Sequence, residues 1–138
     1  MNHDKKFSII IISIFFCYGM FLFFVPISRS DKAVRQYLLR KIPLGTSWNE
    51  TIQIIEKNEK WELEYKSQTY GVVKYKSFDH FLIGNTQDEN KVQIGEQSMV
   101  VYLGEYYFPN SHVVKAYLAF DKDGNLIEIG INKDIDCV

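Results

Sequence analysis

Cysteine is nearly absent from this sequence, which contains two in 138 residues. Cys17 lies within an apolar stretch near the N-terminus, and Cys137 is the penultimate residue. Because only Cys137 lies beyond the apolar stretch, the rest of the chain cannot form an internal disulfide, and its hydrophobic core has to stabilise it alone. Phe15 and Phe16 precede Cys17 where a lipoprotein has small residues, so we do not expect lipidation at Cys17.

An excess of positive charge is also absent, with 16 Lys and Arg against 17 Asp and Glu. This balance gives no basic surface that attracts phosphates, so nucleic acid is not an expected partner. The chain equally lacks the residue spacing of a zinc site, a serine nucleophile elbow and a glycine-rich phosphate loop. We therefore predict no cofactor, no metal and no enzymatic activity.

What the sequence does have is an uncharged run of 21 residues from Phe7 to Ile27. At a rise of about 1.5 Å per residue, a helix of this length matches the ~30 Å hydrocarbon core of a bilayer. The run predicts a transmembrane helix over 7–27 that acts as a signal anchor, with the lipid bilayer as a partner. A leader cleaved after Ser30 is the alternative, because Ser28-Arg29-Ser30 has the small-x-small form of a cleavage site.

Two lysines, Lys5 and Lys6, precede the apolar run, and such a positively charged start normally stays in the cytoplasm. Residues 1–6 are therefore predicted to be cytoplasmic. Residues 28–138 are predicted to form one extracytoplasmic domain of a single-pass protein in the cell membrane, either periplasmic or on the cell surface. A length of about 110 residues suffices for one domain with one modest core.

Two short helices are predicted at the start of that domain. Val34, Leu38 and Ile42 recur at helical spacing, and the following Pro43-Leu44-Gly45 ends the first helix. Ser47-Trp48-Asn49-Glu50 has the S-x-x-E form of a helix N-terminus, so the second helix should begin there and end near residue 58.

Alternating apolar and polar residues after the helices predict an antiparallel sheet of about four strands, with the helices packed on one face. The strands are expected over 61–66, 98–108, 112–120 and 126–133, and Trp61, Leu63 and Tyr65 should face the core. This order of helices and strands makes the fold α+β. The stretch 77–97 is predicted to be a long loop, with Phe81 as a candidate docking residue.

Three residues leave open an enzymatic or small-ligand-binding alternative. Asp79 and His80 are adjacent in the predicted loop and His112 begins a strand, so an acid/base pair could form if the fold brings them together. The run Asp121-x-Asp123-Gly124-Asn125 offers side-chain oxygens, but its glycine stands at the wrong position for a calcium loop. An Asp-Gly pair between two strands indicates a hairpin turn instead.

An aromatic cluster on the predicted strand 98–108 is the main candidate for a binding surface. Tyr102, Tyr106 and Phe108 have even numbers and should share one face of that strand, and Tyr107 and Tyr117 complete the cluster. With the helices on the other face, these side chains would form an exposed patch unless the 77–97 loop covers them. Exposed aromatic patches commonly mark partner sites.

Two short helices joined around Pro43-Leu44-Gly45-Thr46 and followed by an antiparallel meander resemble the small envelope domains typified by the SmpA/BamE lipoproteins and the β-lactamase inhibitor protein fold. The resemblance covers mainly Val34 to Trp61 and the strand order, and it implies protein binding rather than catalysis. We therefore predict a membrane-anchored extracytoplasmic protein-binding domain of the bacterial envelope. An immunity-type inhibitor of a toxin is a second version of the same function.

Overall fold

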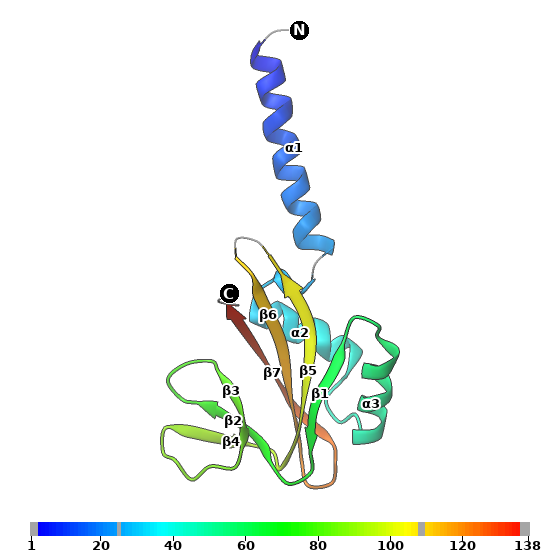
Figure 1. The fold of residues 1–138 in the computed structure, drawn as a ribbon, viewed down its shortest axis with the longest axis vertical. Coiled ribbons are helices and arrows are strands. Elements are labelled where there is room, and N and C mark those ends of the chain that lie inside the picture. Colours follow the sequence, from blue (N-terminus) through cyan, green and yellow to red (C-terminus); the bar gives the residue numbers. More distant parts are fainter. Residues whose placement is uncertain (1–2, 25, 108–109, 136–138) are drawn as a thin grey trace.

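The computed structural model describes residues 3–24, 26–107 and 110–135, leaving aside the side chains of 19–24 and 26. Within these described ranges, three α-helices precede seven strands (Figure 1), so the α+β class is confirmed. The helical elements are α1 (His3–Phe24), the 3-10 helix η1 (Pro26–Ser28), α2 (Asp31–Lys41) and α3 (Trp48–Lys57). The strands are β1 (Glu62–Ser67), β2 (Gly71–Tyr75), β3 (Phe81–Gly84), β4 (Lys91–Ile94), β5 (Gln97–Tyr106), β6 (His112–Phe120) and β7 (Leu126–Ile135).

Helix α1 projects away from the sheets in Figure 1, and the prediction that it spans a membrane over 7–27 is wrong. Among the residues that the structure describes, no helix is both long and apolar enough to cross a bilayer. The predicted run merges two elements, because α1 ends at Phe24 whereas Ile27 lies in η1 and packs against the domain core.

The signal-anchor and single-pass membrane assignments depended on this helix and are wrong for the same reason. The lipid bilayer as a partner and the division into residues 1–6 and 28–138 stay predictions.

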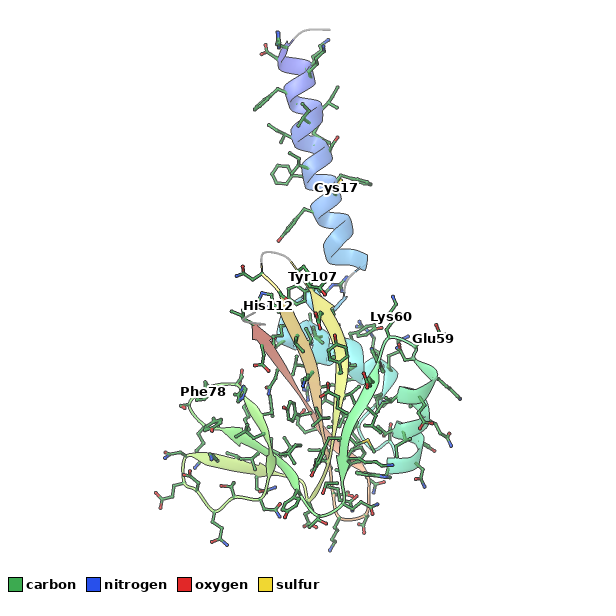
Figure 2. All side chains as sticks on the ribbon, in the orientation of Figure 1. Cys17, Glu59, Lys60, Phe78, Tyr107 and His112 are labelled. Atoms are coloured by element: carbon green, nitrogen blue, oxygen red, sulfur yellow. The ribbon has the colours of Figure 1, made fainter. Side chains whose placement is uncertain are left out.

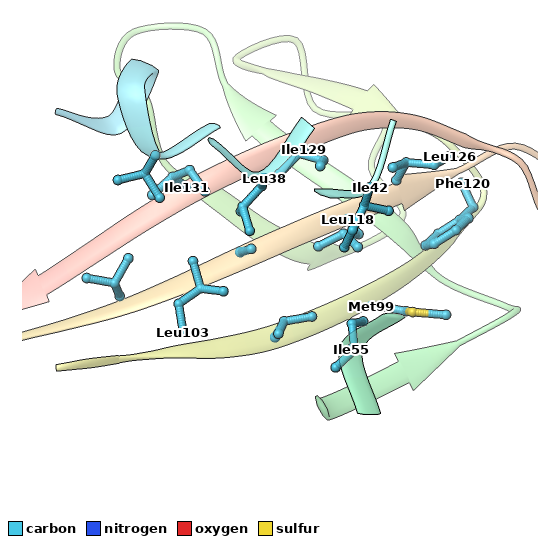
Figure 3. Close-up of a cluster of buried hydrophobic side chains, with 14 residues drawn as sticks. Leu38, Ile42, Ile55, Met99, Leu103, Leu118, Phe120, Leu126, Ile129 and Ile131 are labelled. Carbon is cyan, nitrogen blue, oxygen red and sulfur yellow. The ribbon is translucent and has the colours of Figure 1, made fainter. Parts of the chain in front are cut away.

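Helices α2 and α3 match the two predicted helices. Each begins at a serine whose hydroxyl accepts a hydrogen bond from a backbone N–H of the first turn: Ser30 from Ala33 and Ser47 from Glu50, both at 3.3 Å. Such caps satisfy N–H groups that have no partner within the helix. The helices bury their apolar stripes against one face of a sheet, and this forms the main core (Figure 3). Its members on the helix side are Val34 and Leu38 of α2, Ile42 just after α2, and Ile55 of α3.

The large sheet contains the four predicted strands in the order β1-β5-β6-β7, all antiparallel. Alternate residues of its strands face the helices, as a two-sided strand requires. The sheet residues in the core are Met99, Val101, Leu103, Val114, Ala116, Leu118, Phe120, Leu126, Ile129 and Ile131. One face of this sheet is therefore closed by helices.

A second sheet, in the order β3-β2-β4, replaces most of the loop predicted over 77–97. Strands β3 and β4 have four residues each and lie among Gly, Asn and Asp residues, so their alternation is too brief to stand out from turn chemistry. In Figure 1 this small sheet extends to one side of the large sheet, away from α3. It packs on the face opposite the helices, through a cluster of Val72, Phe81 and Ala119.

Candidate protein-binding surface

The second face of the large sheet is only partly covered by the small sheet. At the covered end, the Ser98 hydroxyl donates to the Tyr70 carbonyl at 2.7 Å, and the Phe81 ring lies so close to Gly130 that a Cβ there would meet ring atoms at 2.5 Å. The residues of this face that lie beyond the small sheet remain accessible. We call this accessible part the open face, and it consists of Glu62, Glu64, Tyr65, Tyr102, Glu105, Val113, Lys115, Tyr117 and Asp134.

Two β-bulges decide which side chains of β1 and β5 reach the open face. The register between β1 and β5 shifts between Leu63 and Tyr65, so Leu63 packs against the core while Tyr65 lies on the open face with 41% of its surface exposed. In β5 the register shifts between Tyr102 and Gly104. Each bulge inserts one extra residue and therefore reverses the alternation beyond it.

Three tyrosines occupy neighbouring rows of the open face. Tyr65 and Tyr117 flank Val100 from the two adjacent strands, and Tyr102 lies one row further along β5. Tyr117 is half-buried at the border with the small sheet and packs against its cluster. Tyr102 is diagonal to both Tyr65 and Tyr117, and diagonal side chains on adjacent strands are within reach of each other, so the three rings form one patch. The strands below them are held by the core on the other face.

Charged groups surround these rings in fixed positions. The Glu105 carboxylate accepts from the Tyr102 hydroxyl at 2.9 Å and from the Tyr107 hydroxyl at 3.0 Å. Burial, with a further contribution from the hydrogen bond to Glu105, raises the pKa of Tyr102 to about 12, so its hydroxyl remains a donor. Lys115 forms an ion pair with Glu64 at 2.9 Å, and this hydrogen bond raises the pKa of the lysine.

The four predicted binding residues do not share one surface. Tyr102 lies on the open face, but Tyr106 lies beyond the bulge on the helix side, where it packs against the core and stacks on His112 with ring centroids 4.7 Å apart. Phe81 is 9% exposed and packs between the two sheets, so little of its ring is accessible to a partner. Phe108 lies outside the described residues.

Sequence reasoning missed Glu64, Tyr65, Glu105 and Lys115 because it assumed regular alternation. One signal was available: a glycine inside a strand pattern often marks a bulge, and Gly104, with φ of +130°, directly follows the extra residue of β5. No comparable residue marks the bulge at Glu64.

The residues of the predicted acid/base alternative are not brought together. Asp79 is 77% exposed at its side chain and pairs with Lys74 at 2.9 Å, and the neighbouring His80 contacts the rings of Tyr75 and Phe78. His112 begins β6 at the end of the large sheet near α1, whereas Phe78 lies at the tip of the small sheet (Figure 2).

A cavity of about 290 Å³ lies between α2, β7 and the small sheet, and Asp79 lines it without either histidine. Its other charged groups include Arg35 and Glu128, which pair with each other at 2.5 Å. Arg35 also donates to the Ile129 carbonyl at 3.2 Å. These groups satisfy one another, so the open face is the better candidate site.

Comparisons with protein-family models, with curated proteins and with solved structures gave no match to this chain. The resemblance to the SmpA/BamE-like envelope domains therefore stays a prediction.

Proposed function

We propose that this chain is a protein-binding domain that contacts its partner through the open face. The observation that supports this is the patch of Tyr65, Tyr102 and Tyr117 on a sheet whose reverse side is fully packed. Tyrosine offers a large contact area with a polar tip at a small entropic cost, which is why it is enriched at interfaces. A rigid backing keeps the cost of ordering this surface on binding low.

The edges of the large sheet are less suited to binding than its face. The β1 edge contains a bulge and the exposed carboxylate of Glu62, and both features oppose the pairing of another strand. At the β7 edge, the backbone of Leu126 already bonds to Thr46 and Gly45, and the Ile129 carbonyl accepts from Arg35. A partner therefore meets the side chains of the open face more readily than free backbone groups.

Photo-crosslinking within cells that produce the full chain tests this proposal. A benzophenone side chain placed at position 65 or 117 should give a discrete crosslinked protein, whereas the same group at Lys57 or Lys60, near the end of α3, should not. Tyr102→Ala should reduce the crosslink at position 65 several-fold, because interface tyrosines often contribute about 1–2 kcal/mol each. Equal products at all four positions, or none at positions 65 and 117, would contradict the proposal.

The identity of the captured protein also separates two versions of this function. A secreted toxin indicates an immunity-type inhibitor, whereas any other protein favours a different binding role.

A further inference from the structure

The open face concentrates negative charge in a chain that is almost neutral overall. It presents four carboxylates, those of Glu62, Glu64, Glu105 and Asp134, against the single amine of Lys115. The whole chain has a formal net charge of only −1. Because Lys115 pairs with Glu64 at 2.9 Å, it neutralises one carboxylate and leaves the other three uncompensated by any ion pair found among the described residues.

The carboxylate of Glu105 is held in place but not saturated. It accepts one hydrogen bond at each oxygen, from the hydroxyls of Tyr102 and Tyr107. An ionised carboxylate has about four acceptor positions, so roughly two remain for a bound donor. The two tyrosine donors fix the plane of the group without neutralising its charge. A preorganised carboxylate of this kind suits a planar cation that can donate two parallel hydrogen bonds.

We infer that the partner presents an arginine-bearing basic segment to the open face, an inference that rests on the proposed function of this surface. Guanidinium groups pair bidentately with carboxylates and stack on aromatic rings, and the open face supplies both next to each other at Glu105 and Tyr102. Lysine lacks the planar fork that donates two parallel hydrogen bonds to one carboxylate, and its ammonium does not stack flat on a ring. Arginine should therefore bind more tightly than lysine at equal charge.

Two synthetic peptides test this inference against the purified full chain. Each peptide has twelve residues, of which four are basic and the others are glycine and serine. The basic residues are arginine in one peptide and lysine in the other. Titration followed by amide NMR should shift resonances of β1, β5 and β6, with the arginine peptide binding at least ~3-fold more tightly.

Two matched triple variants test whether the carboxylates of the open face are the ones that bind the peptide. The first variant combines Glu62→Gln, Glu105→Gln and Asp134→Asn. It should bind the arginine peptide at least ~10-fold more weakly, because each substitution removes a charged hydrogen-bond acceptor. The control carries Glu56→Gln, Glu59→Gln and Glu89→Gln, which remove the same net charge from exposed positions outside the open face. It should change the affinity less than ~2-fold, since exposed charges beyond about a Debye length are screened. Dispersed amide spectra of both variants would show that each is folded.

Equal weakening by the two variants, equal affinity for the two peptides, or shifts confined to α2 and α3 would each overturn the inference. The outcome is separable from that of the crosslinking experiment. A protein captured at position 65 together with no peptide binding refutes the arginine preference and leaves the proposed function standing. Peptide binding without any crosslinked protein refutes the proposed function and leaves the arginine preference standing. The surface then recognises arginine but has no protein partner in the cell.

Discussion

Tyr102 is the residue whose ionisation reports most directly on the open face. Its pKa of about 12 results from burial first and from the hydrogen bond and charge of Glu105 next. Glu105→Gln removes the charge and weakens the hydrogen bond, so the pKa of Tyr102 should fall toward the ordinary value near 10 while burial keeps it above that value. Side-chain carbon NMR at increasing pH measures this in the wild type and the variant, with Tyr102→Phe to assign the signal. A wild-type Tyr102 that titrates near pH 10 would contradict the argument.

The raised pKa of Tyr102 also affects the free energy of unfolding at high pH. Because the folded-state pKa of Tyr102 lies above its unfolded value near 10, the neutral phenol favours the folded state. This contribution is complete below pH 10 and is lost as the pH rises toward 12. In Glu105→Gln the loss should therefore end at a lower pH than in the wild type.

Single residues also explain why the sequence predicted the strands but not the surface. The alternation on β5 correctly placed Met99, Val101 and Leu103 on the core face and Tyr102 on the other. It failed for Tyr106 because one extra residue reverses every later side chain. A bulge changes only one or two backbone angles, so it leaves almost no trace in the hydrophobic pattern.

At the scale of elements, one asparagine adds two hydrogen bonds to the apolar contacts that join the small sheet to the large sheet. The Asn132 side chain accepts from the Phe81 N–H at 3.0 Å and donates to the Phe81 carbonyl at 2.9 Å. It thus satisfies the backbone N–H and carbonyl of Phe81, the first residue of β3, as a neighbouring strand would. A contact between residues 51 positions apart leaves no local signal in the sequence. For this reason the sequence pattern predicted a loop over 77–97.

Asn132→Ala should destabilise the protein by about 2–6 kcal/mol, because two buried backbone groups of Phe81 then lack partners at about 1–3 kcal/mol each. Urea unfolding measures the loss, and hydrogen exchange should show that the amides of β2 and β3 lose protection before those of β5 and β6. Asn90→Ala, at an exposed position between β3 and β4, is the control and should change stability by less than ~0.5 kcal/mol. A small effect of Asn132→Ala would mean that water replaces its hydrogen bonds.

At the scale of the whole molecule, the two faces of the large sheet are covered to different extents. Helices α2 and α3 close one face and complete the main core with it, while the small sheet covers only the far end of the other face. The sequence predicted the first arrangement because helical and strand periodicities are local. The half-covered second face depends on contacts distant in the chain, so only the structure shows where the accessible surface begins.

Helix α1 should be dispensable for folding of the rest of the chain. The main core draws on Ile27 of η1 and on elements beyond it, and no described side chain of α1 belongs to it. A chain that begins at Pro26 should therefore keep its free energy of unfolding within ~0.5 kcal/mol of the value for the full chain. Urea unfolding and amide NMR dispersion measure this.

Ile27→Ala is the matched test of where the domain starts. The Ile27 side chain packs against the core and closely approaches Gly104, where an added Cβ would lie 3.2 Å from its Cδ1. Truncation of this half-buried side chain should cost about 2 kcal/mol in the chain that begins at Pro26. If removal of α1 costs more than Ile27→Ala, the helix contributes to the fold and the domain boundary lies before Pro26. If both changes are neutral, η1 is only a linker and the domain begins at α2.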